Sequence, residues 1–385
     1  MLTLVFLTAV VLAFWVLSLL RALKMVRSGP AVRAQDNVTL PNPPPRVSIC
    51  VPARNEEKNL PALLQGLRAQ RYPDLQIIVV DDNSTDGTWE VLQQHAREDA
   101  RIIPIKSGEP EAGWYGKPNA LRQALTHAQG EWILMTDADC VHDVNCVRNA
   151  VAWALAEGVE ALSLTPRMRC VSFWEKLLIP SIGGLLMTGY SFKRVNDPQD
   201  EKVFGAGAFF LVSRRILDAA GGMEPVRGVA DEDVALARAL KRTGLGYRFA
   251  RGDDVYATRM YTGLGEIFTG FARNTFSTMK GSIRRLVRLS MFILLISVIP
   301  VALLVASVVD FSSGNVTWMS VFGVTAYLAI LGMQAMIRRL GRFDAWVSVF
   351  APLGGVLTWL VVMNSFWLGL RGKGVAWKGR VYPSV

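Results

Sequence analysis

The sequence contains few of the residues that bind transition metals or form disulfides. Its 385 residues include only four cysteines and three histidines. No two cysteines have the C-x-x-C spacing of a zinc or redox site, and the histidines have no metal-ligand spacing. We therefore expect reduced, mostly buried thiols and structural or surface histidines, with no disulfide framework. These residues are Cys50, Cys140, Cys146, Cys170, His95, His127 and His142.

Charged residues are also scarce. Asp, Glu, Lys and Arg make up 19% of the chain and hydrophobic residues 51%, and the mean hydropathy is +0.27. This composition is too apolar for a purely soluble protein of this length. Apolar runs long enough to cross a bilayer occupy residues 2–20, 289–309 and 316–336, and another occupies 345–370. The sequence therefore predicts a membrane protein.

The formal net charge of +10 is concentrated at the ends of these apolar runs. This placement indicates contact with anionic lipid headgroups rather than with nucleic acid, and it predicts that the basic ends lie in the cytoplasm. The residues concerned are Arg21, Lys24, Arg27, Arg33, Arg284, Arg285, Arg288, Arg338, Arg339, Arg342, Arg371, Lys373, Lys378 and Arg380.

The N-terminal run has the features of an anchor. A secretory signal carries its positive charge before the apolar run, whereas here the charge follows residues 2–20. We expect an uncleaved transmembrane anchor over residues 1–24, a Pro-rich linker over 25–45 and a cytoplasmic domain after it.

The C-terminal third is expected to contain an amphipathic interfacial region (263–288), a transmembrane region (289–370) and a basic tail (371–385). Residues 310–315, between the two strong spans, contain no Lys or Arg. Residues 345–370 either cross the membrane once more or form a re-entrant hairpin, for which Pro352 and the glycines after it offer a break.

Residues 46–164 alternate between strand-like and helix-like segments. This order predicts an α/β fold with a mostly parallel sheet and helices on both faces. The expected strands are 47–51, 76–80, 101–105, 132–136 and 161–164, and the expected helices are 56–70, 88–98, 117–128 and 144–157.

The expected strand 132–136 is followed by two carboxylates one residue apart, Asp137 and Asp139. Ligands of α/β sheets bind beyond the carboxyl ends of strands, and residues i and i+2 of an extended segment point to the same side. Both carboxylates can therefore approach one divalent cation and the phosphates that it carries. Carboxylates at a strand end are also common in solvated turns.

Four other segments carry polar residues at strand or helix ends. The first strand leads into Pro52-Ala53-Arg54-Asn55-Glu56, and the second into Asp81-Asp82, whose carboxylates suit hydrogen bonding to a nucleoside, although that loop also fits a turn with a helix cap. Lys117 stands after a glycine at a helix start, where it can face phosphates or simply be solvated. Glu232 and Asp233 open a helical run, and helix capping alone would explain them.

These motifs, taken in order, resemble the large inverting glycosyltransferase family 2 with the GT-A fold. They are Pro52-x-x-Asn55-Glu56, Val80-Asp81-Asp82-x-Ser84-x-Asp86, Gly116-Lys117, Asp137-x-Asp139 and Glu232-Asp233. The resemblance implies a GT-A, Rossmann-like catalytic domain over 46–262 that takes one sugar from a nucleotide-sugar, expected to be a UDP-sugar.

The same resemblance assigns roles to the residues. Asp137 and Asp139 would bind Mg²⁺ or Mn²⁺, and Asp233, with Glu232 beside it, would take the proton of the acceptor hydroxyl. The donor would be bound by Pro52, Ala53, Arg54, Asn55, Glu56, Asp81, Asp82, Lys117, Asp137 and Ala138.

Further segments are similar to bacterial membrane-bound members, including hopene-associated and carotenoid-type glycosyltransferases. They are Ser172 to Pro180, Val195 to Pro198 and Trp377 to Tyr382. They imply a lipid acceptor and a multi-pass protein of the inner (plasma) membrane with its catalytic domain in the cytoplasm.

Several alternatives stay open. The Gln-x-x-Arg-Trp signature of processive synthases is replaced by Gly270 to Phe276, in which Arg273 faces either the diphosphate or the lipid surface. A transferase acting on a polyprenyl phosphate or a surface polysaccharide, and a non-catalytic scaffold, are the other functions considered. Residues 170–195 form either an interfacial segment against the membrane or a helix buried in the catalytic domain. Residues 203–212 form a strand whose small residues allow a ligand close to the backbone.

Overall fold

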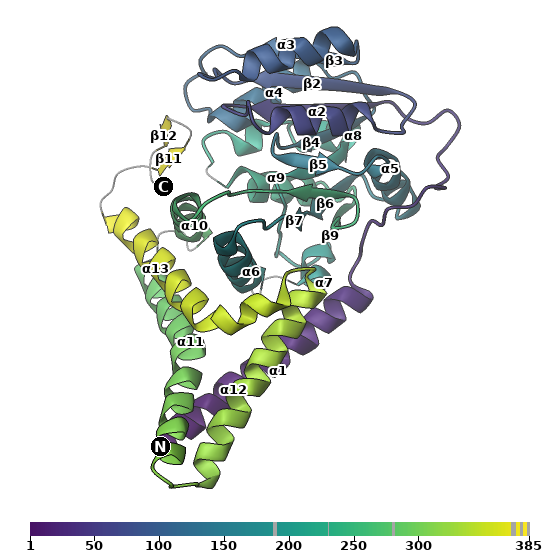
Figure 1. Cartoon of the computed structure of the whole chain (residues 1–385). Coiled ribbons are helices and arrows are strands. Elements are labelled where there is room, and N and C mark those ends of the chain that lie inside the picture. The colour runs from purple at the N-terminus through teal and green to yellow at the C-terminus, as the bar shows by residue number, and fades with distance from the viewer. Residues whose placement is uncertain (188–190, 230, 279–281, 371–374, 378–379, 383–385) are drawn as a thin grey trace.

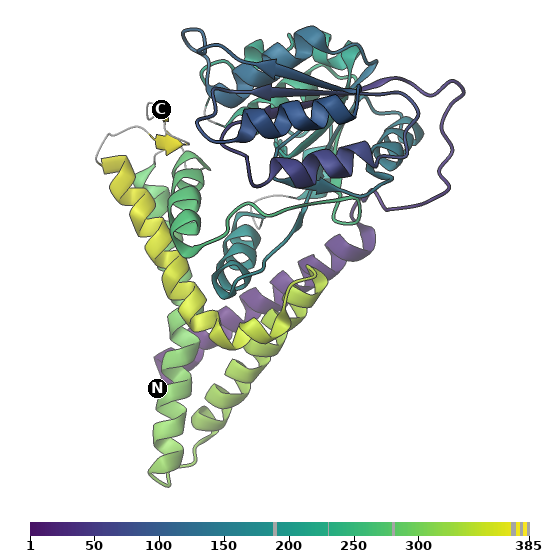
Figure 2. The ribbon, with the colours of Figure 1, turned by 45° about the horizontal axis from the view of Figure 1, so that its top comes forward.

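The computed structural model describes residues 1–187, 191–229, 231–278, 282–370, 375–377 and 380–382 (Figure 1). An α/β domain forms one end of the molecule, and long helices extend from it in a splayed bundle (Figures 1 and 2). The N-terminus lies at the far end of this bundle.

The α/β domain is built on a seven-stranded sheet. Its strands are β3 (Ile102–Lys106), β2 (Leu75–Asp81), β1 (Val47–Ala53), β4 (Trp132–Thr136), β8 (Phe209–Ser213), β6 (Ala161–Thr165) and β9 (Tyr247–Arg251), in that order across the sheet. All neighbouring strands are parallel except β8, which is antiparallel to both β4 and β6. The predicted mostly parallel sheet is confirmed, but the strand expected over 203–212 begins only at Phe209.

Helices cover both faces of the sheet, and each face has its own hydrophobic core. Along β1, Ile49 and Val51 face one core, whereas Cys50 between them faces the other, as strand alternation requires. The first core is closed by α2 (Leu60–Arg68), α3 (Thr88–Glu98) and α5 (Cys146–Ala156), and the second by α4 (Gly116–His127), α8 (Arg214–Ala219), η1 (Glu224–Val226) and α9 (Glu232–Arg242). All four cysteines are free, as predicted.

A small second sheet lies beside the carboxyl end of β4. Its strands are β5 (Cys140–His142), β10 (Tyr256–Thr258) and β7 (Arg167–Met168), with β10 in the middle. Thr258 pairs with Cys140, directly after Asp139. This sheet therefore brings two distant segments of the chain to the end of the β4 strand.

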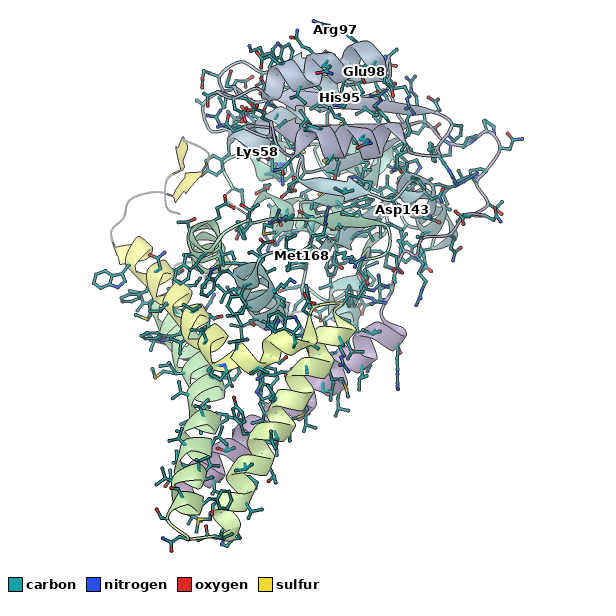
Figure 3. All side chains as sticks on the ribbon, in the orientation of Figure 1. Lys58, His95, Arg97, Glu98, Asp143 and Met168 are labelled. Atoms are coloured by element: carbon teal, nitrogen blue, oxygen red, sulfur yellow. The ribbon has the colours of Figure 1, made fainter. Side chains whose placement is uncertain are left out.

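Four helices among the described residues are long and apolar enough to cross a membrane: Leu2–Ser28, Ile283–Ser312, Trp318–Leu340 and Ala345–Trp367. The first three are α1, α11 and α12, and the fourth combines η2 (Ala345–Phe350) with most of α13 (Ala351–Leu370). Side chains along the lower bundle are mostly carbon in Figure 3, whereas charged tips such as those of Arg97 and Glu98 lie on the α/β domain.

The C-terminal apolar segment is not a broken hairpin. Pro352 stands in the first turn of α13, directly after η2, and the helix continues without interruption through Gly354 and Gly355 to Leu370. It packs on the first half of α11, where the Trp359 indole N–H donates to the Ser290 hydroxyl at 2.5 Å. Figures 1 and 2 show α13 running from the end of α12 toward α10 (Leu264–Thr278).

Residues 170–195 form α6 (Phe173–Met187) and α7 (Phe192–Asn196). Leu177, Leu178, Ile179 and Ile182 of α6 are buried against α10, η2 and α13. Helix α6 therefore packs against α10 and the C-terminal helices at their boundary with the α/β domain, and not inside either core of the sheet. The tail contributes β11 (Val375–Trp377), paired antiparallel with β12 (Arg380–Tyr382), and residues 371–374, 378–379 and 383–385 of the predicted basic tail lie outside the described residues.

Candidate active site

A cavity of about 3050 Å³ opens at the carboxyl ends of β1 and β4 and continues between the α/β domain and the long helices. All but one of the predicted site residues line it: Pro52, Ala53, Arg54, Asn55, Glu56, Asp82, Lys117, Asp137, Ala138, Asp139, Glu232 and Asp233. The exception is Asp81. Motifs that are far apart in the sequence thus meet in one place, which local sequence patterns alone could not demonstrate.

Lys117 joins two of these motifs. Its ammonium group lies 2.7 Å from a carboxylate oxygen of Asp137 and 3.3 Å from one of Glu232. Burial by itself would lower the pKa of Lys117, but the surrounding carboxylates of Asp137, Glu232 and Asp233 raise it above its usual value. The lysine therefore carries a positive charge at all physiological pH values.

Asp139 lies in a region with excess negative charge. Burial raises its pKa to about 6, and the nearby carboxylates of Asp137 and Glu56 contribute to the rise, whereas Lys117 and the Thr258 hydroxyl oppose it. A carboxylate that is costly to ionise here becomes easy to ionise once a cation is bound beside it. The local charge balance therefore favours a bound cation.

Asp233 stands in the first turn of α9, where the backbone N–H of Val234 donates to its carboxylate at 2.8 Å. Burial raises its pKa to about 7, the charge of Glu232 adds to the rise, and Lys117 opposes it. A carboxylate with a pKa in this range can accept a proton near neutral pH, which is what a general base must do.

The loop before β8 approaches these side chains closely. A Cβ at Gly207 would lie 3.1 Å from Nζ of Lys117 and 3.3 Å from Cβ of Asp233, and one at Gly205 would lie 2.9 Å from the carbonyl oxygen of Asp233. The sequence predicted that small residues here allow a ligand close to the backbone. The groups that approach are the site's own side chains, so these glycines shape the site itself.

The loops after β1 and β2 hold each other in place. Arg54 donates to the carbonyl oxygens of Asp82 at 2.6 Å and Asn83 at 3.1 Å, and Asn55 accepts from the N–H of Thr85 at 2.8 Å. Asn55 and Asn83 have φ values of 53° and 54°, in the left-handed region that asparagine tolerates better than most residues. Arg54 therefore holds the second loop as well as lining the cavity.

Asp81 and Asp82 differ in position although they are neighbours in the sequence. Both are almost fully buried, at 1% and 2% exposure, but Asp82 lines the cavity, whereas Asp81 does not and accepts the N–H of Ser84 at 3.1 Å. Successive residues at the end of an extended strand point to opposite sides, so only one of the pair can face the cavity. The structure assigns the wall position to Asp82 and a turn-forming contact to Asp81.

Residues 48–221, which contain most of these loops, match the family model described as Glycosyl transferase family 2. This domain belongs to glycosyl transferase family 2. Among curated proteins, the chain is similar to 4,4'-diaponeurosporenoate glycosyltransferase of Staphylococcus aureus (strain USA300), with 26% identity over 341 residues that cover 87% of this chain and 88% of the relative.

The family 2 domain also has a GT-A fold in common with a solved structure. A mannosyltransferase from Pyrobaculum calidifontis, determined in complex with GDP-Man and Mn²⁺, aligns with a TM-score of 0.50 at 19% identity and covers 95% of this chain and 99% of its own. The alignment extends over the long helices as well as the α/β domain. The predicted GT-A fold class is therefore confirmed, and the family model supports the predicted family over residues 48–221.

Beneath the acidic residues of the family 2 domain lies a structural histidine. His142 is buried, its ring stacks on Tyr256 with centroids 5.9 Å apart, and its Nε2 lies 3.2 Å from the Thr136 hydroxyl. Burial lowers its pKa to about 4, so the imidazole is neutral at physiological pH. His142 supports the segment that carries Asp139 through its contacts with Thr136 and Tyr256.

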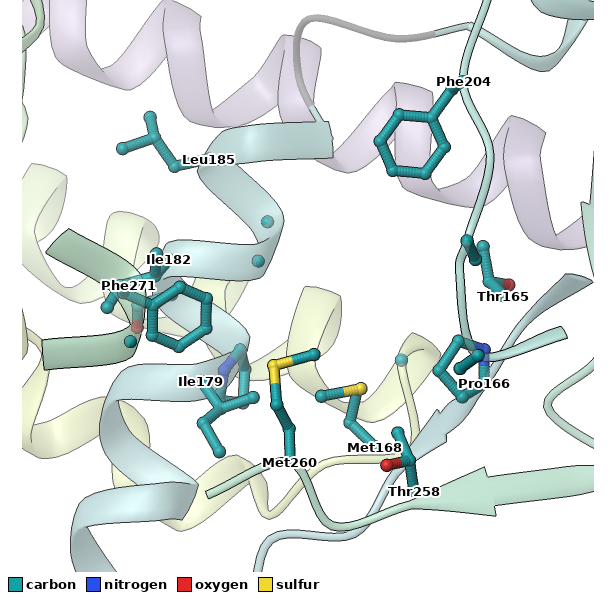
Figure 4. A pocket seen from close by; sticks show the side chains of 18 of the residues that line it. Thr165, Pro166, Met168, Ile179, Ile182, Leu185, Phe204, Thr258, Met260 and Phe271 are labelled. Atoms are coloured by element: carbon teal, nitrogen blue, oxygen red, sulfur yellow. The ribbon is translucent and has the colours of Figure 1, made fainter. Parts of the chain in front are cut away.

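An apolar wall adjoins the acidic residues of the family 2 domain. Met168 and Met260 lie next to each other on this wall, and Ile179 and Ile182 of α6 and Phe271 of α10 complete it (Figure 4). The sequence did not indicate that these residues form one wall, because they come from four separate segments of the chain and share no common motif. The side chain of Arg273, considered above as a diphosphate contact, lies outside the described residues.

Replacing Gly207 by Ala is expected to lower kcat/KM for sugar transfer by the protein by about tenfold or more. This corresponds to a loss of about 1.4 kcal/mol of transition-state stabilisation. The added methyl group would lie within 3.3 Å of both Lys117 and Asp233 and displace one of them. Steady-state kinetics would measure the effect. Gly332→Ala on α12 is the control, because a Cβ there meets nothing within 4 Å, and equal rates for both variants would contradict the prediction.

Proposed function

We propose that this protein is a membrane-bound, inverting glycosyltransferase that transfers a single sugar from a nucleotide-sugar to a lipid hydroxyl at the cytoplasmic membrane face. The observation that carries the proposal is the continuity of the cavity. Asp137 and Asp233 line it in the α/β domain, and Ile293 of α11 and Ile330 of α12 line it among the long helices. A lipid within the bilayer could thus place its polar end at the acidic residues while its chain stays among apolar side chains.

The arrangement supports a single displacement. Asp233 takes the proton of the acceptor hydroxyl while the hydroxyl oxygen forms a bond to the anomeric carbon of the sugar. The bond between that carbon and the diphosphate oxygen breaks, and the nucleoside diphosphate leaves with the electron pair. Lys117, held by Asp137 and Glu232, is placed to attract the leaving phosphates.

Asp137 and Asp139 fit a Mg²⁺ or Mn²⁺ ion. The described residues contain no group of three or more metal ligands, so the protein would supply two carboxylates and the phosphates and water the remaining oxygens, as is common for magnesium sites. The excess negative charge around Asp139 favours such an ion. When bound, the cation would neutralise charge that develops on the departing diphosphate.

Charge placement supports a cytoplasmic catalytic domain. Helix α1 runs from the N-terminus toward the α/β domain, and the turn between α11 and α12 lies at the far end of the bundle (Figure 1). Arg27 in the last turn of α1, Arg284 in the first turn of α11 and Arg339 in the last turn of α12 therefore lie on the side of the α/β domain. By the positive-inside rule this is the cytoplasmic side, which in a bacterium corresponds to the inner membrane.

The comparisons guide the choice of substrates. The staphylococcal relative is, by its name, a glycosyltransferase acting on 4,4'-diaponeurosporenoate, which supports an extended apolar acceptor. The mannosyltransferase was determined with GDP-Man, so donors other than UDP-sugars belong in the test.

The experiment that tests the proposal measures radiolabel from a panel of UDP- and GDP-sugars in the organic-extractable lipid of membranes containing the full chain, with and without Mn²⁺. Label in the lipid fraction that depends on the protein would support the proposal and name the donor. Label only in insoluble polymer would support a polysaccharide synthase instead. A failure to bind or use any donor in the panel would support a scaffold and overturn the proposal.

Transfer is expected to depend on pH through Asp233. The base works only when its carboxylate is deprotonated, and its pKa is raised to about 7. The rate should therefore be highest above that pH and fall about tenfold for each further pH unit well below it. A pH profile of the initial rate at saturating donor, with the stability of the protein checked at each pH, measures this, and a rate that is flat down to about pH 5 would contradict the assignment.

A further inference from the structure

Helix α6, which forms part of the apolar wall, contains a proline in its interior. Pro180 has no backbone N–H, so the carbonyl oxygen of Lys176, four residues earlier, has no donor within the helix. The carbonyl oxygen of Leu177, one residue later, accepts a hydrogen bond from the Ser181 hydroxyl at 2.8 Å. Buried carbonyl groups without a donor destabilise a fold, and a proline in the middle of a helix normally kinks or breaks it.

Arg338 of α12 supplies the missing donors. Its guanidinium donates to the carbonyl oxygen of Lys176 at 2.8 Å and to that of Leu177 at 3.2 Å, and it also donates to the hydroxyl of Ser181 at 3.0 Å. Arg338 is 7% exposed, and these three partners are neutral. The planar guanidinium can bond both carbonyls at once, which a lysine ammonium on its flexible stem does less well.

Helix α6 is also connected to the site through an ion pair between Glu175 and Arg259. Glu175, fully buried, accepts two hydrogen bonds from Arg259, at 3.1 and 2.9 Å. Arg259 directly follows Thr258, whose hydroxyl contacts Asp139, and directly precedes Met260 of the apolar wall. A shift of α6 would move Ile179, Ile182 and, through Arg259, Met260, which all belong to the apolar wall.

Ile179 and Ile182, on either side of Pro180 in the sequence, line the pocket (Figure 4). The ion pairs that Lys117 makes with Asp137 and Glu232 involve no residue of α6. The Lys117 contacts on the donor side therefore do not include α6, whereas the apolar wall is partly built from it.

We propose that Arg338 is a positioning residue for the acceptor. By bonding the Lys176 carbonyl that Pro180 leaves free, together with the Leu177 carbonyl and the Ser181 hydroxyl, it fixes the position of α6 and with it the apolar wall that receives the acceptor chain. This inference rests on the proposed lipid acceptor. It assigns to Arg338 a role beyond the membrane-flanking charge that its place in the sequence suggests.

The test compares full-length wild type with Arg338→Met, Arg338→Lys and, as the matched control, Arg339→Met, whose side chain is exposed on the same helix. The variants are assayed in nanodiscs that contain increasing amounts of the acceptor lipid, which is the unglycosylated form of the lipid that wild type labels. Arg338→Met should raise the KM for that lipid about tenfold and leave the KM for the donor and the slow hydrolysis of the donor by water within about twofold. Arg338→Lys should lie between, and Arg339→Met should match wild type.

A double-mutant cycle with Pro180→Ala separates this role from a general loss of stability. Alanine at this position restores an N–H that can bond the carbonyl of Lys176, so the effect of Arg338→Met on the lipid KM should be smaller in the Pro180→Ala background. The same coupling should appear in thermal unfolding of the four variants, which needs no acceptor. Equal effects of Arg338→Met in both backgrounds, or equal rises in donor and lipid KM, would overturn the inference, whereas a wild type that labels no lipid would instead overturn the proposed function.

Discussion

Replacing Asp233 by Asn is expected to abolish sugar transfer while nucleotide-sugar binding stays within about twofold of wild type. Asn has nearly the same shape, so the packing around α9 and Gly207 is kept, but it cannot accept the proton of the acceptor hydroxyl. Loss of a general base typically lowers the rate ~10² to 10⁴-fold. Transfer of radiolabel to lipid measures the rate, and titration calorimetry with the donor measures binding.

The control for this variant is Asp218→Asn. Asp218 is exposed on α8 and does not line the cavity, so the same chemical change there should leave both transfer and binding unaltered. Normal turnover by the Asp233→Asn variant would show that another group accepts the proton. Equal loss of transfer and of donor binding would instead show that Asp233 acts mainly in holding Lys117 and the donor.

Replacing Asp139 by Ala is expected to remove the metal-dependent part of donor binding, weakening affinity in the presence of Mn²⁺ by at least about tenfold, or about 1.4 kcal/mol. The reason is the charge balance around this residue. Asp137 already bonds Lys117 at 2.7 Å, whereas the carboxylate of Asp139 carries a raised pKa in its acidic surroundings and gains most from a cation. Donor affinity measured across a Mn²⁺ titration gives this readout without requiring an acceptor.

Two comparisons make that result decisive. Without metal, wild type and Asp139→Ala should bind the donor with similar affinity. In that case the loss of the carboxylate removes no bound cation, and it slightly lowers the repulsion between the site and the phosphates. Asp218→Ala is the matched control and should retain the full metal dependence. A donor affinity that responds to Mn²⁺ equally in wild type and Asp139→Ala would rule out Asp139 as a metal ligand.

Local patterns in the sequence predicted most elements of the α/β domain. β4 and α3 have the predicted bounds, Trp132–Thr136 and Thr88–Glu98, because alternation and helical periodicity report directly which side of a segment is buried. The expected helix over 56–70 begins only at Leu60. Glu56 and Glu57 bond the loop after β2 instead, through Thr88 and Gly87, and such a long-range contact leaves no local periodic signal.

The direction of β8 and the split between Asp81 and Asp82 show a second kind of limit. A strand looks the same in sequence whether its neighbours are parallel or antiparallel, so the reversed β8 could not be predicted. Adjacent residues at a strand end are chemically equivalent in the sequence, and the side on which the cavity forms decides which one contacts a ligand.

The sequence by itself determined the long apolar helices, the basic residues at their ends and the order of acidic motifs after the strands, because length, composition and short-range spacing control each of these. Only the tertiary structure decided that Lys117 meets both Asp137 and Glu232, and that Met168 and Met260 share one wall. It also decided that Arg338 bonds carbonyls of α6, which stands far earlier in the chain. Such contacts depend on how whole elements pack in three dimensions, and a buried face in a sequence indicates that a partner exists without indicating which partner it is.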